Sequence, residues 1–260
     1  MENNLLMPLQ ELKDFLEYKH DLYNTPSFIE TDPISIPHTY NIREDIEIAA
    51  FLTATIAWGQ RKAILKNASK LMMQLGNSPY SFIMEASEVE LKKASAFVHR
   101  TFNHQDTYYF LKSLRNIYEQ GGLLPIFENS FQKYGDLKNC LDEFRIIFLS
   151  LELCGRTSKH VSDVMTGSSA KRLNMFLRWM VRQDSRGVDF GLWKNISASA
   201  LYLPLDVHTG NVSRKLQLLL RKQNDWKAVE EVTAHLRTFD PLDPVKYDFA
   251  LFGLGVFEEF

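Results

Sequence analysis

Apolar residues recur at helical spacing along almost the whole of this 260-residue chain, and this pattern limits its fold more than any other feature. Segment 45–58, DIEIAAFLTATIAW, is so apolar that it predicts a helix buried on most sides. Ser87 and Glu90 predict a capping box, and Asp106 is placed to cap a later helix. Alternating runs bounded by hairpin turns are missing from the sequence, so few strands are expected. The sequence therefore predicts an all-α fold.

Glycine and proline divide the chain into segments. Gly76 and Pro79 end the helix predicted for 62–76, and 87–102 is expected to be helical as well. Residues 25–40 contain three prolines and predict an extended linker. The chain is long enough for one large domain or two modest ones, and 45% hydrophobic residues suffice for a substantial core.

Net charge is distributed unevenly along the sequence. The chain carries 30 Lys and Arg against 32 Asp and Glu, a formal charge of -2. Residues 156–222 hold 12 of the basic and four of the acidic residues, a balance of +8, which leaves 18 against 28, or -10, elsewhere. A positive face concentrated on one segment suits a polyanionic partner. A solvated helical surface is the alternative explanation.

Composition disfavours several classes of protein. The longest apolar stretch, FALFGLGVF at 249–257, is far shorter than the ~20 residues of a membrane span. The first 20 residues do not have the pattern of a signal peptide, so we expect an unprocessed cytoplasmic protein. Cys140 and Cys154 are too few for an iron–sulfur cluster and are expected to be buried thiols. His99 and His104 do not share one helical face, so no metal ion or other cofactor is predicted.

Residues 156–183 predict a short helix, a tight turn and a second helix. Gly167 permits a positive φ in the turn, and Ser168 or Ser169 is a good N-cap for the second helix. The N–H groups at such a helix start could hold a phosphate. Lys171 then lies in the first turn, where the helix dipole favours the neutral amine that a Schiff-base nucleophile needs.

A carboxylate follows 35 positions later. Asp206 comes after the apolar stretch LYLPL at 201–205 and before a helical pattern, so it is expected to cap a helix at the edge of the core. A carboxylate in that position can deprotonate a nucleophile or stabilise a developing cation. Taken alone, each residue has an ordinary structural reading, because surface lysines and aspartate N-caps are common.

Together these segments resemble the helix-hairpin-helix DNA glycosylases that include endonuclease III. GSSAKRLNMFL at 167–177 is similar to the family run G-x-G-x-K-T-A-N-x-x-L, and LPLDVHTGNVSRKL at 203–216 is similar to its aspartate motif. Residues 48–71 resemble the helix that opens the glycosylase core, with a weaker similarity at 243–255. The whole chain also resembles a bacterial family described only as a domain of unknown function.

The resemblance implies a two-lobed fold and a set of site residues. One lobe would span 41–185 and the other 1–40 with 186–260. Lys171 would attack the anomeric carbon of a flipped nucleotide, and Asp206 would activate the lysine. Double-stranded DNA would be the partner, and its predicted contacts are Gly167, Ser168, Ser169, Arg172, Arg178, His208, Arg214 and Lys215. The base pocket would take Trp58, Gln60, Phe249 and Phe252.

Departures from the family pattern are also visible. Ser169 occupies the place of a second hairpin glycine, and Val207 stands where threonine is usual. Between Lys171 and Asp206 lie 34 residues, more than endonuclease III-like members have, although the archaeal branch that acts on oxidised guanine is similar in this respect. The extra segment 184–197 is expected to loop out. The iron–sulfur cysteines of some members are missing, so no cluster is implied.

We therefore expect a DNA repair glycosylase, with possible AP-lyase activity, acting on a damaged base such as oxidised guanine. Two alternatives remain open from the sequence: a nucleic-acid-binding protein without chemistry, and a helical scaffold for a protein partner. For Trp58 and Trp179 the sequence favours a place in the core over one in the pocket, because aromatic rings often fill helical interiors. It says nothing of the oligomeric state.

Overall fold

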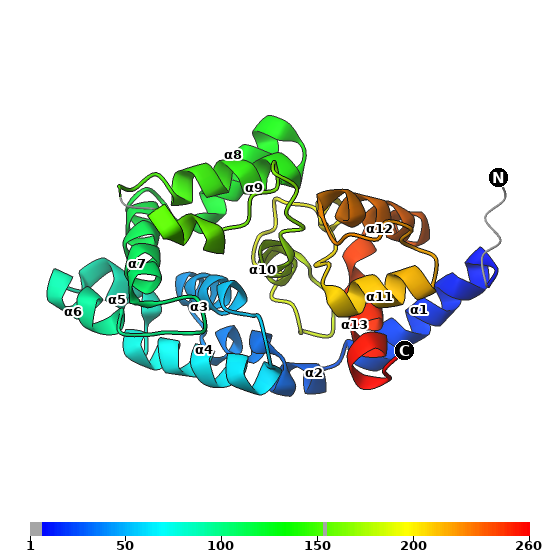
Figure 1. Ribbon diagram of the computed structural model, residues 1–260, viewed down its shortest axis with the longest axis horizontal. Coiled ribbons are helices and arrows are strands. Elements are labelled where there is room, and N and C mark those ends of the chain that lie inside the picture. Colours follow the sequence, from blue (N-terminus) through cyan, green and yellow to red (C-terminus); the bar gives the residue numbers. More distant parts are fainter. Residues whose placement is uncertain (1–6, 153–154) are drawn as a thin grey trace. The chain divides into compact units, whose positions relative to one another are not determined.

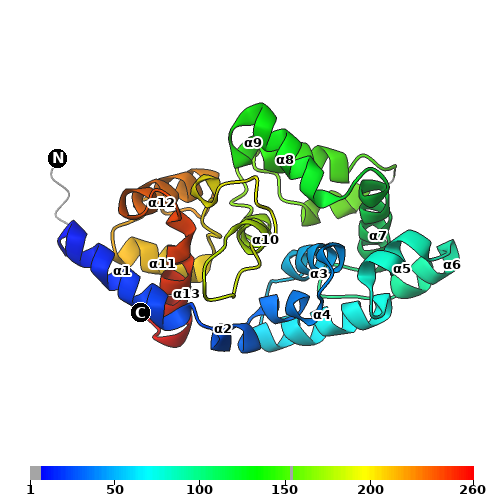
Figure 2. The ribbon, with the colours of Figure 1, turned by 180° about the vertical axis from the view of Figure 1, so that it is seen from behind.

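The computed structural model describes residues 7–152 and 155–260, and these residues form helices joined by turns and loops (Figures 1 and 2). Within those ranges the only strand-like pairings are two isolated bridges, so the predicted all-α fold is confirmed. The α-helices are α1 Leu9–Tyr23, α2 Pro26–Thr31, α3 Arg43–Thr55, α4 Arg61–Leu75, α5 Pro79–Glu85, α6 Glu88–Ala94, α7 His104–Glu119, α8 Leu123–Tyr134, α9 Leu137–Phe148, α10 Lys171–Val181, α11 Val207–Lys215, α12 Trp226–Phe239 and α13 Asp248–Phe257. Short 3₁₀ turns are η1 Pro33–Ser35, η2 Pro37–Thr39, η3 Gly155–His160, η4 Ala198–Ala200 and η5 Pro244–Tyr247.

The chain divides into two compact units. Unit 1 combines Met1–Phe28 with Val164–Phe260, and unit 2 is Ile29–Asp163. The predicted lobes were 41–185 and 1–40 with 186–260, so the boundaries differ. Helix α10 was expected in the first lobe, but it belongs to unit 1 with the C-terminal helices.

Unit 2 is built around α3, which is buried from Asp45 to Thr55 as its composition predicts. Helices α4, α5 and the 3₁₀ turns η1 and η2 pack against it, while α8 and α9 pair with each other. A cluster of buried phenylalanine rings fills the interior, where Phe51 lies 5.5 Å from Phe144 and 5.2 Å from Phe148 between ring centroids. Such rings contribute much of the apolar burial of a helical core.

Unit 1 is held together by α13, which packs against both α1 and α11 (Figures 1 and 2). Gly253 makes the close approach to α1 possible, because a Cβ on it would lie 2.1 Å from a ring carbon of Tyr23. The Tyr23 ring in turn stacks on Phe257 at 5.4 Å. None of the helices that the structure describes is long and apolar enough to cross a bilayer.

Several local predictions were wrong. Residues 25–40 are not an extended linker, because Pro26, Pro33 and Pro37 each begin a helical turn. Proline suits the first position of a helix, where no backbone N–H bond is required. The helix expected at 87–102 ends at Ala94. The N-cap of α7 is Asn103, not Asp106. Asp106 is the third residue of the helix, and its side chain completes the capping box with Asn103.

The segment 184–197 does not loop out as expected. Val188 and Trp193 are fully buried, and backbone N–H groups of this segment donate to the carbonyls of Trp179 and Met180 at the end of α10. The segment therefore satisfies carbonyl groups that a helix C-terminus otherwise leaves to solvent. Of the two cysteines, Cys140 is buried as predicted, and Cys154 lies outside the described residues.

Candidate active site

Lys171 and Asp206 lie together in unit 1. Their closest side-chain atoms, Nζ and Oδ2, are 3.8 Å apart, and the side chains keep 26% and 22% of their surface exposed. This separation is that of an ion pair and is longer than a direct hydrogen bond. Both groups are therefore close enough for proton transfer after a small movement or through one water molecule, and both can be reached from solvent.

Lys171 is the first residue of α10, as predicted, but its helix begins in an unexpected way. Neither Ser168 nor Ser169 caps it; the N-cap is Ala170, in a left-handed conformation with φ 47°, and it provides no side-chain bond. Ser168 Oγ instead accepts from the N–H of Ala170 at 3.2 Å, and Asn174 Nδ2 donates to the Ser169 carbonyl at 3.1 Å. The turn before Lys171 is thus fixed by local bonds.

Asp206 is the N-cap of α11, as predicted. Its Oδ1 accepts from the N–H of Thr209 at 3.0 Å, while Thr209 Oγ1 accepts from the N–H of Asp206 at 2.8 Å. This reciprocal capping box fixes the carboxylate on the helix axis. Oδ1 is occupied by the cap, and Oδ2 faces the ammonium of Lys171. Lys171 and Asp206 therefore each sit at the positive end of a helix.

A third charged group, Asp248 at the start of α13, lies buried near this pair. Burial raises its pKa to about 6, with the carboxylate of Asp206 adding to that effect and Arg178 and Lys171 opposing it. Asp248 is ion-paired with Nη1 of Arg178. The electrostatic field at Lys171 and Asp206 thus includes a carboxyl group that changes charge near neutral pH.

Arg178 is an interior residue. It is 4% exposed, and its guanidinium pairs with Asp248 and, through Nε at 3.2 Å, with Asp189. Arg182 is also buried and pairs with Asp189 at 3.1 Å and with Asp243 at 2.9 Å. We therefore leave Arg178 out of the DNA contacts that we propose below, because its charge is used inside unit 1.

Ion pairing within the fold also reduces the predicted positive face. Of the 12 basic residues in 156–222, at least six form ion pairs with carboxylates: Arg156, Lys171, Arg178, Arg182, Arg186 and Arg221. The local charge balance therefore overstates what this segment offers to a polyanion. Charge read from sequence does not reveal which cations are already neutralised by residues distant in the chain.

The remaining predicted DNA contacts have varied surroundings. Gly167 and Arg172 are partly exposed, and Gly167 has φ 99°, the positive value that its turn requires. His208 is exposed on α11. Arg214 donates from Nε to the Arg221 carbonyl at 2.8 Å, so it is held against the protein. Lys215 is exposed, with Nζ 5.5 Å from the ring centroid of Phe260.

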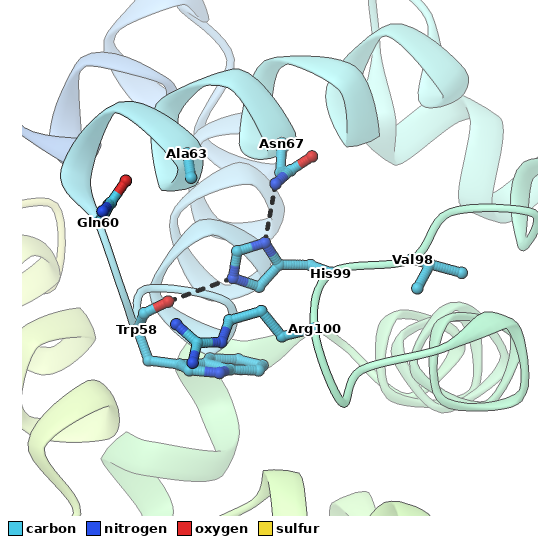
Figure 3. Close-up of a pocket in the computed structure, with 7 residues that line it drawn as sticks. All are labelled: Trp58, Gln60, Ala63, Asn67, Val98, His99 and Arg100. Atoms are coloured by element: carbon cyan, nitrogen blue, oxygen red, sulfur yellow. Dashed lines mark hydrogen bonds between the residues drawn. The ribbon is translucent and has the colours of Figure 1, made fainter.

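Of the predicted base-pocket residues, Trp58 and Gln60 line one cavity of about 240 Å³ in unit 2 (Figure 3). The side chain of Arg100, which has a positive φ of 54°, extends toward the turn at 58–60. Gly59 has a positive φ of 102°, which favours glycine in this turn, and a Cβ on it would lie 2.4 Å from Nη1 of Arg100. The other lining residues are Ala63, Asn67, Val98 and His99.

Histidines position the indole of Trp58. The His99 ring meets it edge-on at 4.9 Å, and the His160 ring stacks on it at 5.9 Å. His99 is buried, with Nδ1 2.9 Å from Asn67 Nδ2 and Nε2 3.3 Å from the Trp58 carbonyl (Figure 3). Burial lowers the pKa of His99, so it is neutral at physiological pH, donating from Nε2 and accepting at Nδ1. The cavity thus has a fixed aromatic wall and polar amide groups.

Phe249 and Phe252 belong to unit 1 and are not among the residues that line the cavity of unit 2. Phe249 is fully buried, with its centroid 4.5 Å from the guanidinium carbon of Arg178. Phe252 is partly exposed and lies 6.1 Å from Phe28. We therefore treat Phe249 as a core residue.

The sequence did not single out Asp248, Asp189 or Arg100. Asp248 and Asp189 are ordinary acids in the sequence, and only tertiary contact with Arg178 reveals their burial. Nothing near Arg100 in the sequence indicates its left-handed backbone. In residues 7–152 and 155–260, no group of three or more His, Cys, Asp or Glu is arranged to hold a metal ion.

The comparisons with known proteins define the family. Residues 32–257 match the model of a family described as "Protein of unknown function (DUF2400)". The match covers most of the chain, which therefore belongs to this family. No curated protein and no solved structure matched it.

Proposed function

We propose that this protein is a lysine-dependent DNA glycosylase of the helix-hairpin-helix type, acting on a damaged base and able to cleave the resulting abasic site. The observation that carries the proposal is the pairing of Lys171 and Asp206 at 3.8 Å, at the N-terminal ends of two helices and open to solvent. An amine beside a carboxylate is the minimum needed to form and then resolve a Schiff base with a sugar.

In the proposed reaction, the Asp206 carboxylate accepts a proton from the Lys171 ammonium. The neutral amine then attacks C1′ of an extruded nucleotide; the C1′–N bond breaks, and the base leaves with the proton that Asp206 accepted. Asp206 is then a carboxylate again, and its negative charge stabilises the positive charge on the amine now bonded to C1′. A proton passes from this amine to O4′ as the C1′–O4′ bond breaks, and ring opening leaves a protonated imine between Lys171 and C1′. Loss of a C2′ proton then expels the 3′ phosphate, which is the AP-lyase step.

Within unit 2, the cavity lined by Trp58, Gln60, Asn67 and Arg100 has the features needed to bind a nucleobase against the indole of Trp58. The indole is partly exposed, and two histidine rings fix its orientation. Base-flipping enzymes read the extruded base by stacking and by hydrogen bonds to its edge, which the amides of Gln60 and Asn67 can form. The cost of extrusion, a few kcal/mol, is lowest for a damaged base.

We place the phosphate backbone at the turn 167–169 and on partly or fully exposed side chains of unit 1. The candidates are Gly167, Ser168 and Ser169 with Arg172, His208, Arg214 and Lys215. The start of α10 is without a side-chain cap, and N–H groups at a helix start favour an anion. The internal pairing of other cations implies a modest salt dependence for DNA binding.

The variant Lys171→Gln tests the proposal. We expect base release and strand cleavage on a duplex with 8-oxoguanine to fall at least about 10³-fold, while the dissociation constant for DNA changes little, because Lys171 is one cation among several. The matched control Lys222→Gln removes the same charge from an exposed position of the same unit and should keep full activity.

The rival functions predict different results. A nucleic-acid-binding protein without chemistry would bind the duplex but release no base in the wild type. A scaffold for a protein partner would not bind DNA even at low salt. The observation that favours the scaffold is that at least six of the 12 cations are neutralised within the fold.

A further inference from the structure

Three consecutive residues, 224–226, touch both the turn before Lys171 and the cap that holds Asp206. Asn224 Nδ2 donates to the backbone carbonyl of Asp206 at 2.9 Å. The N–H of Trp226 donates to the Gly167 carbonyl at 2.9 Å, and Asp225 forms an isolated antiparallel bridge with Ser168.

This segment is itself rigidly held. Trp226 is 2% exposed, and its indole Nε1 donates to Glu230 Oε1 at 2.7 Å. Asp225 caps α12 by accepting from the N–H of Ala228 at 3.1 Å. Because this segment is fixed by a buried indole and a capped helix start, it can hold the turn 167–169 and the Asp206 backbone in place. Moving either one would break hydrogen bonds.

Asn224 is oriented from a second side. Arg214 Nη2 donates to its Oδ1 at 2.5 Å, so that Nδ2 must face the Asp206 carbonyl. Gly210 makes room for this amide: a Cβ there would lie 2.8 Å from Oδ1 and 2.9 Å from Nδ2 of Asn224. The chain Arg214–Asn224–Asp206 therefore also explains why Arg214, predicted to contact DNA, lies against the protein.

We infer that residues 224–226 form a positioning segment that sets the distance between Lys171 and Asp206, and that Asn224 is the positioning residue for Asp206. The inference rests on the proposed function, since it concerns the geometry of the same amine and carboxylate. Asn224 acts through Asp206 and is not itself placed at the reacting atoms. Proton transfer between the pair depends on a separation of a few ångströms, and a misplacement of about 1 Å can cost on the order of 10²-fold in rate.

The test uses Asn224→Asp in the full-length protein. A carboxylate keeps the shape and still accepts from Arg214, but it cannot donate to the Asp206 carbonyl. We expect the single-turnover rate of borohydride-trapped adduct with an abasic duplex to fall about 10- to 100-fold, with an unchanged DNA dissociation constant. Gln223→Glu is the matched control: it adds the same charge one residue away, at an exposed position, and should trap at the wild-type rate.

A double-mutant cycle separates positioning from general destabilisation. In an Asp206→Asn background, Asn224→Asp should cause no further loss of trapping, because the group that it positions has already lost its function. Gly210→Ala, whose methyl group would displace the Asn224 amide, should reproduce the loss in the wild-type background. Thermal unfolding of each variant shows whether the fold is kept.

The outcomes distinguish the inference from the proposed function. If the wild type forms no adduct, the proposed function is overturned, and the inference with it. If the wild type forms the adduct and Asn224→Asp traps as fast as Gln223→Glu, the inference alone is overturned. An equal loss in the wild-type and Asp206→Asn backgrounds also overturns it.

Discussion

Arg178 illustrates at the scale of single residues how charge is used inside this protein. Two buried carboxylates, Asp189 and Asp248, share its guanidinium, and the ring of Phe249 covers it at 4.5 Å. Taking three charges out of water costs several kcal/mol, which only close pairing offsets. The guanidinium of Arg178 therefore makes it possible to bury Asp189 and Asp248 next to the candidate site.

Replacing Arg178 by methionine should destabilise the protein by about 3–5 kcal/mol, because the buried Asp248 loses its ion pair and Asp189 keeps only its pair with Arg182. Chemical denaturation measures the change in the free energy of unfolding. Lys194→Met is the control: Lys194 is exposed and bonds only Gln183 among the contacts described for it. A loss below about 1 kcal/mol for Arg178→Met, the range of a surface pair, would contradict this account.

At the scale of elements, helix packing in unit 1 depends on the approach of α13 to α1. Gly253 faces the ring of Tyr23, whose atoms would lie 2.1–2.5 Å from an added Cβ. Alanine stabilises an exposed helix interior relative to glycine by about 1 kcal/mol, so an ordinary helical glycine would gain from this change. Here the ring occupies the space that the methyl group needs.

We expect Gly253→Ala to destabilise the protein by about 1–3 kcal/mol, the usual cost of overpacking a close contact. The sign of the change in melting temperature is the measurement. In a Tyr23→Ala background the same substitution should become neutral or stabilising, because the obstructing ring is gone. A stabilising Gly253→Ala in the wild-type background would show that the two helices are not in such close contact.

The elements also show how far the sequence could predict this fold. Helices with strong apolar periodicity, such as α3, and caps that depend on local residues, such as Asp206 on α11, were predicted correctly. Residues 25–40 were not, because a proline that begins a helix has the same appearance in sequence as one that breaks it. Segment 184–197 is held by ion pairs of Asp189 with Arg178 and Arg182, which no local pattern reveals.

At the scale of the whole molecule, stability should vary with pH through buried groups of unit 1. Burial lowers the pKa of His20 to about 4, with Arg182 and Arg186 adding to the effect. The unfolded chain therefore binds a proton between pH 6.5 and about 4 that the folded chain does not, and stability falls as the pH falls through this window. Asp248, with its pKa raised to about 6, acts in the opposite direction, since its ionisation weakens the fold as the pH rises from about 4 to 6.

Because these effects oppose each other, the His20 contribution is measured by difference. The free energy of unfolding of wild type and His20→Gln should be compared at pH 7 and pH 4. Glutamine does not titrate, so the wild type should lose up to about 3 kcal/mol more than the variant on acidification. Equal losses would contradict the assignment of His20 as a buried neutral group.

Part of the candidate site could be predicted from motifs that lie far apart in the chain. The order of a turn, a lysine and a later aspartate indicated which residues to consider, and the structure brings Lys171 and Asp206 to 3.8 Å. The supporting residues were not predictable: Asn224 and Asp248 act through tertiary contacts with no spacing of their own. The two-lobed glycosylase-like architecture, the DNA partner and the cytoplasmic location stay predictions.

The most direct measurement is borohydride trapping of the wild-type protein with duplexes that contain an abasic site or 8-oxoguanine, followed by mass spectrometry of the digested adduct. Reduction of the imine would join C1′ of the sugar to the amine by a stable bond. We predict an adduct on the peptide that contains Lys171, and its loss in Lys171→Gln. An adduct on another lysine, or none with either duplex, would contradict the assignment of Lys171 as the nucleophile.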